Sequence, residues 1–282
     1  MGRMEPSTAQ VPTLTRLRLA HGVLEHLARE AQVPILHVKG VALHPVLAEG
    51  RRPSTDCDLL VHPAHVDTLV PALVAAGWGQ VTSFRHGSVF AHAATFHHPV
   101  WGTVDVHRSF PGLDRDPEET FALMWAGAHA VDLGGASCAV PDLLAQRLLL
   151  LVHAARDASG HARHDVRVCW TEADAAERER LDALAARLGA TVPLVIATGR
   201  PELARGLPGE HIWSALHARA DSRGIRRARW RDAAGVRERA ALLLDAARVN
   251  PDHLALRLGH RPSRAEMRRE WFDRLGRALR RR

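Results

Sequence analysis

Two short motifs in this sequence have the spacing of side chains that share one face of a β-strand. Asp56 and Asp58 are separated by one residue, and Asp105 and His107 repeat that spacing further along the chain. Because alternate side chains of a strand point to the same side, each pair is expected on one face and its apolar neighbours on the other. If the two strands are neighbours in a sheet, three carboxylates converge.

Such a convergence of carboxylates needs a positive charge. Carboxylates a few ångströms apart repel, and one of them becomes protonated unless a divalent cation neutralises the group. Oxygen ligands suit Mg²⁺ or Mn²⁺, which keep positions open for water and substrate phosphates. Two such ions can hold the attacking and leaving oxygens of a displacement at phosphorus, so the pattern favours nucleotidyl transfer. The alternative for an isolated Asp-x-Asp is a solvated strand end.

The segments around these motifs predict the order strand, helix, strand, helix, after a leading helix. Apolar spacing and Gly and Pro positions assign the leading helix to residues 13–31, strands to 35–38 and 56–62, and helices to 41–48 and the stretch after Pro63. Further strands are expected at residues 79–84, 88–96 and 103–110, and a hairpin at 130–133 and 137–140 that turns at Gly134-Gly135.

The second half of the sequence is helical in pattern, with helices expected at residues 143–155, 173–188, 229–248 and 264–279. The last begins with the capping-box pair Ser263 and Glu266, and a stripe of Met267, Trp271, Leu275 and Leu279 is expected to pack in a core. We therefore predict an α+β fold: a mixed-sheet domain at residues 1–140, then an all-helical domain at 141–282.

Residues 35–110 resemble the nucleotidyltransferase superfamily with a polymerase-β-type core, and especially its bacterial branch of uncharacterised nucleotidyltransferases. The resemblance rests on Lys39-Gly40 after a strand, Arg52 four residues before Asp56-Cys57-Asp58-Leu59-Leu60-Val61, and Asp105-Val106-His107. It implies a polymerase-β-like catalytic core. It also implies a transferase that moves a nucleoside monophosphate from a triphosphate such as ATP to an acceptor.

The resemblance also implies roles for single residues. Asp56 and Asp58 would bind the metal, and Asp105 would complete the site and accept the proton of the attacking hydroxyl. The residues expected to contact the nucleotide are Lys39, Gly40, Arg52 and His107. Gly40 would admit the triphosphate at a helix N-terminus. Relatives commonly have Gly-Ser where this chain has Lys-Gly, so a serine hydroxyl is missing from that turn.

Each of these residues has an alternative interpretation. Lys39 either contacts a phosphate or points toward the sheet, and Arg52 either contacts a phosphate or pairs with a surface acid. His107 either binds phosphate, orients Asp105 or transfers a proton, or it makes a structural hydrogen bond. For His153, Arg167 and Asp174 we favour helix packing and surface pairing over substrate contact.

The composition limits the other classes of protein. Lys39 is the only lysine among 38 basic residues, which suggests that a compact ammonium is needed there. Residues 223–282 hold 18 arginines against 7 acidic residues, a basic tail for which a solvated helical face is favoured over nucleic-acid binding. The three cysteines match neither a disulfide framework nor a zinc module. With no leader-like or membrane-spanning apolar run, we expect a cytoplasmic protein without membrane contact.

The acceptor is not readable from these residues, and a small molecule, a peptide or a protein side chain are all open. RNA is a weaker candidate because few aromatic residues interrupt the basic tail. The competing hypothesis is a catalytically silent protein of the same fold that binds a nucleotide or RNA.

Overall fold

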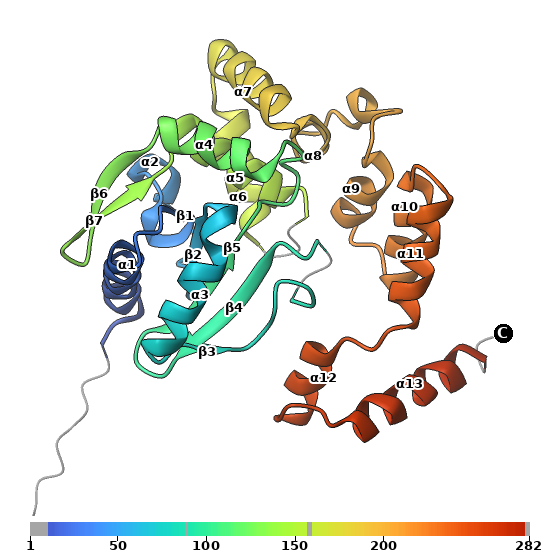
Figure 1. Ribbon diagram of the computed structural model, residues 1–282. Helices are drawn as coiled ribbons and strands as arrows, with labels where there is room; N and C mark the ends of the chain where they lie inside the picture. The colour runs from blue at the N-terminus through green and yellow to red at the C-terminus, as the bar shows by residue number, and fades with distance from the viewer. Residues whose placement is uncertain (1–10, 88–89, 157–159, 280–282) are drawn as a thin grey trace, which may run out of the picture.

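The computed structural model describes residues 11–87, 90–156 and 160–279, and Figure 1 shows its arrangement. The strands are β1 (Ile35–Val38), β2 (Asp56–Val61), β3 (Gly79–Gln80), β4 (Ala93–His98), β5 (Gly102–His107), β6 (His129–Leu133) and β7 (Ala136–Val140). The helices are α1 (Thr13–Glu30), α2 (Pro45–Ala48), α3 (Val66–Ala75), α4 (Pro117–Ala126), α5 (Leu143–Ala154), α6 (His161–Val166), α7 (Ala175–Leu188), α8 (Thr191–Ala197), α9 (Glu210–His217), α10 (Ser222–Asp232), α11 (Val236–Ala247), α12 (Pro251–Leu258) and α13 (Arg264–Leu279). Shorter turns are η1 (Gly40–Ala42), η2 (Pro63–His65), η3 (Arg167–Thr171) and η4 (Pro201–Ala204).

The main sheet is mixed and has the strand order β1-β2-β5-β4-β3. Only β2 and β5 run parallel, and in their register Asp58 lies opposite Asp105. Strands β6 and β7 form a separate hairpin, whose turn places Gly134 and Gly135 at positive φ. The mixed sheet and the α+β fold class are thus confirmed.

Helices cover both faces of the main sheet because both faces of its central strands are apolar. On one face, Cys57 and Leu59 of β2 belong to an apolar cluster with Leu17 and Leu24 of α1. On the other face, Leu60 belongs to a larger cluster built mainly from α4, α5, α7 and α8. Asp58 lies on this second face by strand alternation, so the acidic residues open toward the side of the sheet that the later helices cover.

Several expected elements in the first half are shorter than the sequence pattern indicates; the strand expected at residues 103–110, for example, ends at His107. The helix predicted at residues 41–48 is split into η1 and α2, because Leu43 and His44 are extended before Pro45 and the residue before proline disfavours the helical conformation. Gly40 therefore begins a single turn, and the helix N-terminus predicted for phosphate binding is absent there. The strand predicted at 79–84 ends at Gln80, because the amides of Val81 and Thr82 both bond to the Thr95 carbonyl and the register is lost.

The second half also differs from its prediction. The helix predicted at residues 229–248 is two helices, α10 and α11, separated around Gly235, whose backbone is extended. The helices α6, α8, α9 and α12 were not predicted, and neither was α4 in the first half, although Asp116 caps its N-terminus. The predicted stripe on α13 does not pack in a core at Trp271, which is 40% exposed. The side chains of Leu275 and Leu279 lie outside the described residues, as does Ser88 at the start of the predicted strand 88–96.

The larger apolar cluster contains residues from both sides of the predicted boundary at residue 140, such as Val38 and Leu148. The division into two domains stays a prediction. Further along, Asp252 of α12 accepts hydrogen bonds from the backbone and hydroxyl of Ser83, both at 2.7 Å, so the C-terminal helices also contact the segment between β3 and β4. Within the described ranges, no helix is both long enough and apolar enough to cross a membrane.

Candidate active site

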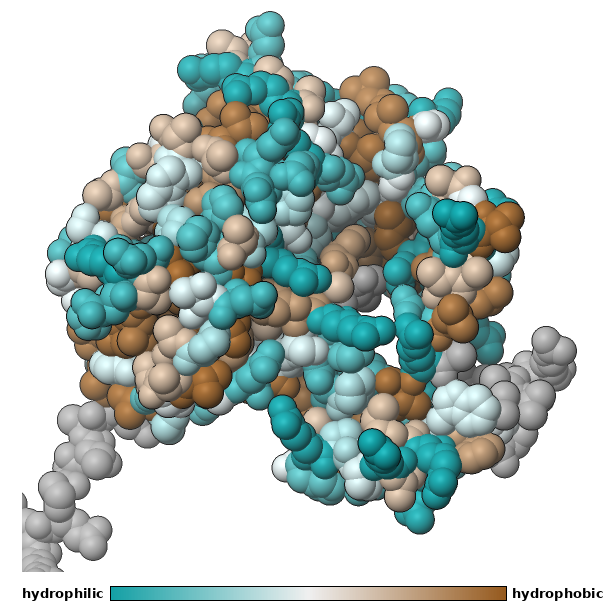
Figure 2. Space-filling model, viewed as in Figure 1, coloured by the Kyte–Doolittle hydropathy of each residue, from teal (hydrophilic) through white to brown (hydrophobic). Residues whose placement is uncertain are grey.

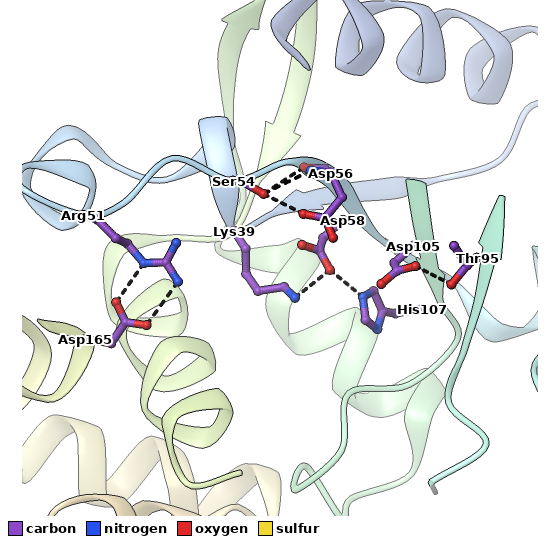
Figure 3. A network of polar contacts seen from close by, with 9 residues as sticks. All are labelled: Lys39, Arg51, Ser54, Asp56, Asp58, Thr95, Asp105, His107 and Asp165. Carbon is purple, nitrogen blue, oxygen red and sulfur yellow. Dashed lines mark hydrogen bonds and ion pairs between the residues drawn. The ribbon is translucent and has the colours of Figure 1, made fainter. Parts of the chain in front are cut away.

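Asp58 and Asp105 are brought together by the parallel pairing of β2 with β5. They are register partners, and one ligand atom from each, together with one from His107, lie within 4.8 Å of one another. Strand alternation predicted that three carboxylates converge, and the structure instead groups Asp58 and Asp105 with His107, three side chains that Figure 3 shows directed toward one another. Asp56 is not part of that group.

Asp58 is a buried carboxylate with two donors on the same oxygen. Its Oδ1 lies 2.6 Å from Lys39 Nζ and accepts a hydrogen bond of 2.8 Å from His107 Nε2, and the residue is 5% exposed. Burial by itself would raise the pKa of Asp58, but the Lys39 ammonium and the His107 hydrogen bond outweigh it and hold the pKa below its ordinary range. Asp58 is therefore a carboxylate at neutral pH.

Lys39 reaches Asp58 from a strained turn after β1. Its φ is +59° and that of Gly40 is +50°, a region that side-chain-bearing residues rarely adopt. A Cβ on Gly40 would lie 3.2 Å from the Ser54 Cβ, so the glycine also allows a close approach between this turn and the segment before β2. Of the two interpretations of Lys39, the structure matches the one that points it toward the sheet.

Asp105 has the opposite electrostatic setting. Its carboxylate accepts a hydrogen bond of 2.7 Å from the Thr95 hydroxyl on β4. Burial raises the pKa of Asp105, and the negative charges of Asp58 and Asp56 raise it further, against the opposing effect of the Thr95 hydrogen bond. Two neighbouring carboxylates with pKa values moved in opposite directions are suited to different roles, one as a fixed charge and the other as a proton acceptor.

Asp56 is turned toward a residue that the sequence analysis did not single out. The Ser54 hydroxyl donates a hydrogen bond of 2.6 Å to Asp56 Oδ1, as Figure 3 shows. Ser54 packs against Gly40, so a hydroxyl stands beside the Lys-Gly turn that itself lacks a serine. The signal available in the sequence was a serine two residues before an aspartate, a common local hydrogen-bonding pattern.

Arg52 is exposed, and no ion pair joins it to another described residue. It lines a cavity of about 330 Å³ together with Gly40 and Ser54. Its neighbour Arg51 instead makes a two-pronged ion pair with Asp165 of α6, at 2.8 and 3.1 Å. This pair ties the segment before β2 to the helical half, and no sequence signal marks it because its members are 114 residues apart.

Aromatic rings border the acidic group. The Phe110 ring lies 6.0 Å from Lys39 Nζ and 5.9 Å from the Arg156 guanidinium. The His92 ring lies 5.3 Å from the His107 ring, and burial lowers the pKa of His92 to about 2, with the charge of His107 adding to the effect. Aromatic rings therefore line the site, and by excluding water they strengthen the electrostatic interactions among its charged side chains.

The donor set fits a hard divalent cation. Asp58 and Asp105 offer carboxylate oxygens, which Mg²⁺ and Mn²⁺ prefer, and His107, within the same 4.8 Å group, donates to Asp58 through Nε2. Burial, together with the negative charges of Asp58 and Asp56, raises the pKa of Asp105, so its ionised form would be favoured by further positive charge. A divalent cation would supply that charge.

The other candidates in the helical half have structural contacts. Asp174 caps α7 in a reciprocal capping box with Glu177, and Arg167 pairs with the exposed Glu172. His153 is a half-buried residue of α5. The contacts of Asp174 and Arg167 agree with the helix packing and surface pairing favoured for them.

Comparison with known proteins places the site in context. A family model described as uncharacterised nucleotidyltransferase matches residues 8–204. Among solved structures, the chain is similar to the crystal structure of the lincosamide antibiotic adenylyltransferase LnuA with lincomycin bound, at 16% identity and a TM-score of 0.37, over 52% of this chain and 92% of that one. A TM-score of this size supports no argument about the site. No curated protein matches the chain.

Proposed function

This chain belongs to the uncharacterised nucleotidyltransferase family, and from that premise we propose that it moves a nucleoside monophosphate from a nucleoside triphosphate to an acceptor, with Mg²⁺ or Mn²⁺ at Asp58 and Asp105. The observation that carries the proposal is the pairing of these two carboxylates across β2 and β5. Asp56 is the third ligand that the resemblance implies. A bound divalent ion supplies Lewis-acid stabilisation of the charge on the phosphates.

The proposed reaction divides the work between the two carboxylates. An acceptor oxygen bonds to the α-phosphorus, the bond from that phosphorus to the bridging oxygen breaks, and pyrophosphate leaves with the electron pair. Asp105 takes the proton of the attacking hydroxyl, because Lys39 and His107 both engage Asp58 and leave Asp105 with the Thr95 hydrogen bond. Lys39 and His107 hold Asp58 in its ionised form and in position, which is the role we assign to them in place of direct phosphate contact.

Two cavities support an arrangement of the substrates. The cavity of about 330 Å³ is lined by Gly40 and Ser54 and by Arg18, Arg51 and Arg52, and we assign the phosphates to it because Arg52 makes no ion pair with another described residue. A second cavity, of about 440 Å³, is lined by Phe90 and Arg156 together with residues of α9 and α12. Figure 2 shows the surface indented where the C-terminal helices meet the rest of the molecule. We assign the acceptor to this second cavity.

The test is transfer of an α-phosphate label. The protein is incubated with each α-labelled triphosphate, Mg²⁺ or Mn²⁺ and a cell extract, and the labelled product is isolated to identify the acceptor. We expect label transfer that chelation abolishes and that Asp58→Asn or Asp105→Asn reduces by at least about 100-fold. The exposed Asp67 of α3 provides a matched control, and Asp67→Asn should leave transfer unchanged.

The same experiment separates the competing hypothesis. Triphosphate binding without pyrophosphate release or label transfer would favour a catalytically silent binding protein. Transfer that survives in the Asp58→Asn, Asp105→Asn double variant would eliminate the site assignment.

A further inference from the structure

A second group of metal-ligand side chains lies away from the acidic site, where α1, β1 and the β6–β7 hairpin meet. Glu25 of α1, His37 of β1 and Cys138 of β7 each place one donor atom within 4.8 Å of the other two. These residues come from three separate segments, and sequence spacing gave no sign of them. They do not belong to the catalytic group, which lies on the other face of the sheet.

His37 is held at both ring nitrogens. Its Nε2 lies 3.1 Å from Glu25 Oε2, and its Nδ1 lies 2.7 Å from Nδ1 of His21, with both imidazoles fully buried. Metal-binding histidines are commonly oriented by a partner on the ring nitrogen that does not bind the metal. His21 is placed to do this for His37, which leaves Nε2 directed at Glu25 and Cys138.

Cys138 is fully buried, and its thiol lies 3.9 Å from the His21 carbonyl, a weak hydrogen bond. Oxygen, nitrogen and sulfur donors together suit Zn²⁺ rather than Mg²⁺. One carboxylate and one thiolate also neutralise a divalent ion, while Arg29 pairs with the other oxygen of Glu25 at 3.1 Å.

The distances are close to those of a zinc site. Ligands at about 2.0 to 2.3 Å in a tetrahedron lie about 3.3 to 3.8 Å apart, and His37 Nε2 and Glu25 Oε2 are already 3.1 Å apart. The Cys138 sulfur lies within 4.8 Å of both, at most about 1 Å beyond that spacing. Glu25 also lines a cavity of about 580 Å³ with Arg29 and Ser137, which gives an ion a route in and a water molecule access to the fourth position.

We propose that Glu25, His37 and Cys138 form a second metal site, for Zn²⁺ or a similar transition-metal ion, oriented by His21. The ion would join α1, β1 and the hairpin. Because His37 is two residues before Lys39, the ion would also fix the position of β1, the strand after which Lys39 reaches Asp58. This site does not depend on the proposed transfer reaction.

The test uses the full chain freed of metal by chelation and then titrated with Co²⁺ and Zn²⁺. To remove ions bound at the acidic site, the titration is repeated in the Asp58→Asn, Asp105→Asn double variant. We expect one Co²⁺ per chain in that variant, with a thiolate-to-cobalt charge-transfer band and the visible bands of a tetrahedral site, both displaced by Zn²⁺. Zn²⁺ should also raise the melting temperature.

The substitution Cys138→Ser should abolish the charge-transfer band, whereas Cys169→Ala, which also removes a buried free thiol, should leave it unchanged. If circular dichroism shows that Cys138→Ser does not fold, the test uses Glu25→Gln in its place. Glu25 is partly exposed, so this substitution disturbs the fold less. That variant should bind Zn²⁺ at least about tenfold more weakly. The proposal is wrong if the double variant binds no Co²⁺ or Zn²⁺, if the band survives Cys138→Ser, or if Glu25→Gln leaves affinity unchanged.

Discussion

Replacing Lys39 by methionine tests whether its ammonium keeps the charge of Asp58 inside the fold. The variant keeps the length of the side chain but removes its charge. The carboxylate of Asp58, a residue that is 5% exposed, then keeps His107 as its remaining donor among the described residues. Removing one partner of a buried ion pair typically lowers the free energy of unfolding by about 3 to 5 kcal/mol. Because the His107 hydrogen bond persists, we expect about 3 kcal/mol at pH 8.

The loss should depend on pH in a definite direction. In the wild type the pKa of Asp58 is lowered, so its contribution to stability is present above the ordinary pKa of an aspartate and disappears only as the pH falls through the lowered value. Without Lys39, the largest influence that opposes burial is lost and the pKa of Asp58 rises, so the variant is penalised while Asp58 stays charged and recovers as Asp58 becomes protonated. The stability difference between wild type and variant should therefore shrink from pH 8 to pH 5.

Urea unfolding followed by circular dichroism at pH 5 and pH 8 measures this difference. Arg167→Met is the matched control, because its pair with Glu172 is about half exposed and should contribute less than about 1 kcal/mol. Lys39→Arg should recover only part of the loss, since a planar guanidinium does not fit the place of a compact ammonium. A Lys39→Met variant within about 1 kcal/mol of wild type at both pH values would refute the reasoning.

Three further substitutions test other parts of the site. Asp105→Asn should reduce label transfer by at least about 100-fold. Its urea midpoint at pH 7 should nevertheless equal or exceed that of the wild type, because a raised pKa of Asp105 means that its charged form is unfavourable in the folded state. A lower urea midpoint would contradict this. Arg51→Met should lower the free energy of unfolding by about 3 kcal/mol, because the substitution leaves the buried Asp165 without its ion pair. The double variant Arg51→Met, Asp165→Leu should recover part of this loss in the same urea assay. Gly40→Ala should lower the free energy of unfolding by about 1 kcal/mol, because alanine is strained at this positive φ. It should also reduce label transfer, because the new Cβ would displace Ser54. Unchanged kinetics would show that the contact between Gly40 and Ser54 is dispensable.

Local pattern was sufficient for the elements that depend on neighbouring residues. The alternation in β2 and β5 correctly put Asp58, Asp105 and His107 on one face, because the side-chain period of a strand is fixed by its backbone. The hairpin at Gly134-Gly135 and the hydrogen bonds of the Ser263 cap on α13 were predicted for the same reason. Where local signals competed, as at Pro45, the prediction of a continuous helix was wrong.

The sequence by itself determined that acidic side chains would face one side of a sheet, and the single lysine marked a special position. Only the tertiary structure decided that Lys39 pairs with Asp58 and that Arg51 reaches Asp165. It also decided that Glu25, His37 and Cys138 meet. These contacts join segments that are distant in the chain, and packing, which no local period encodes, brings them within reach of one another.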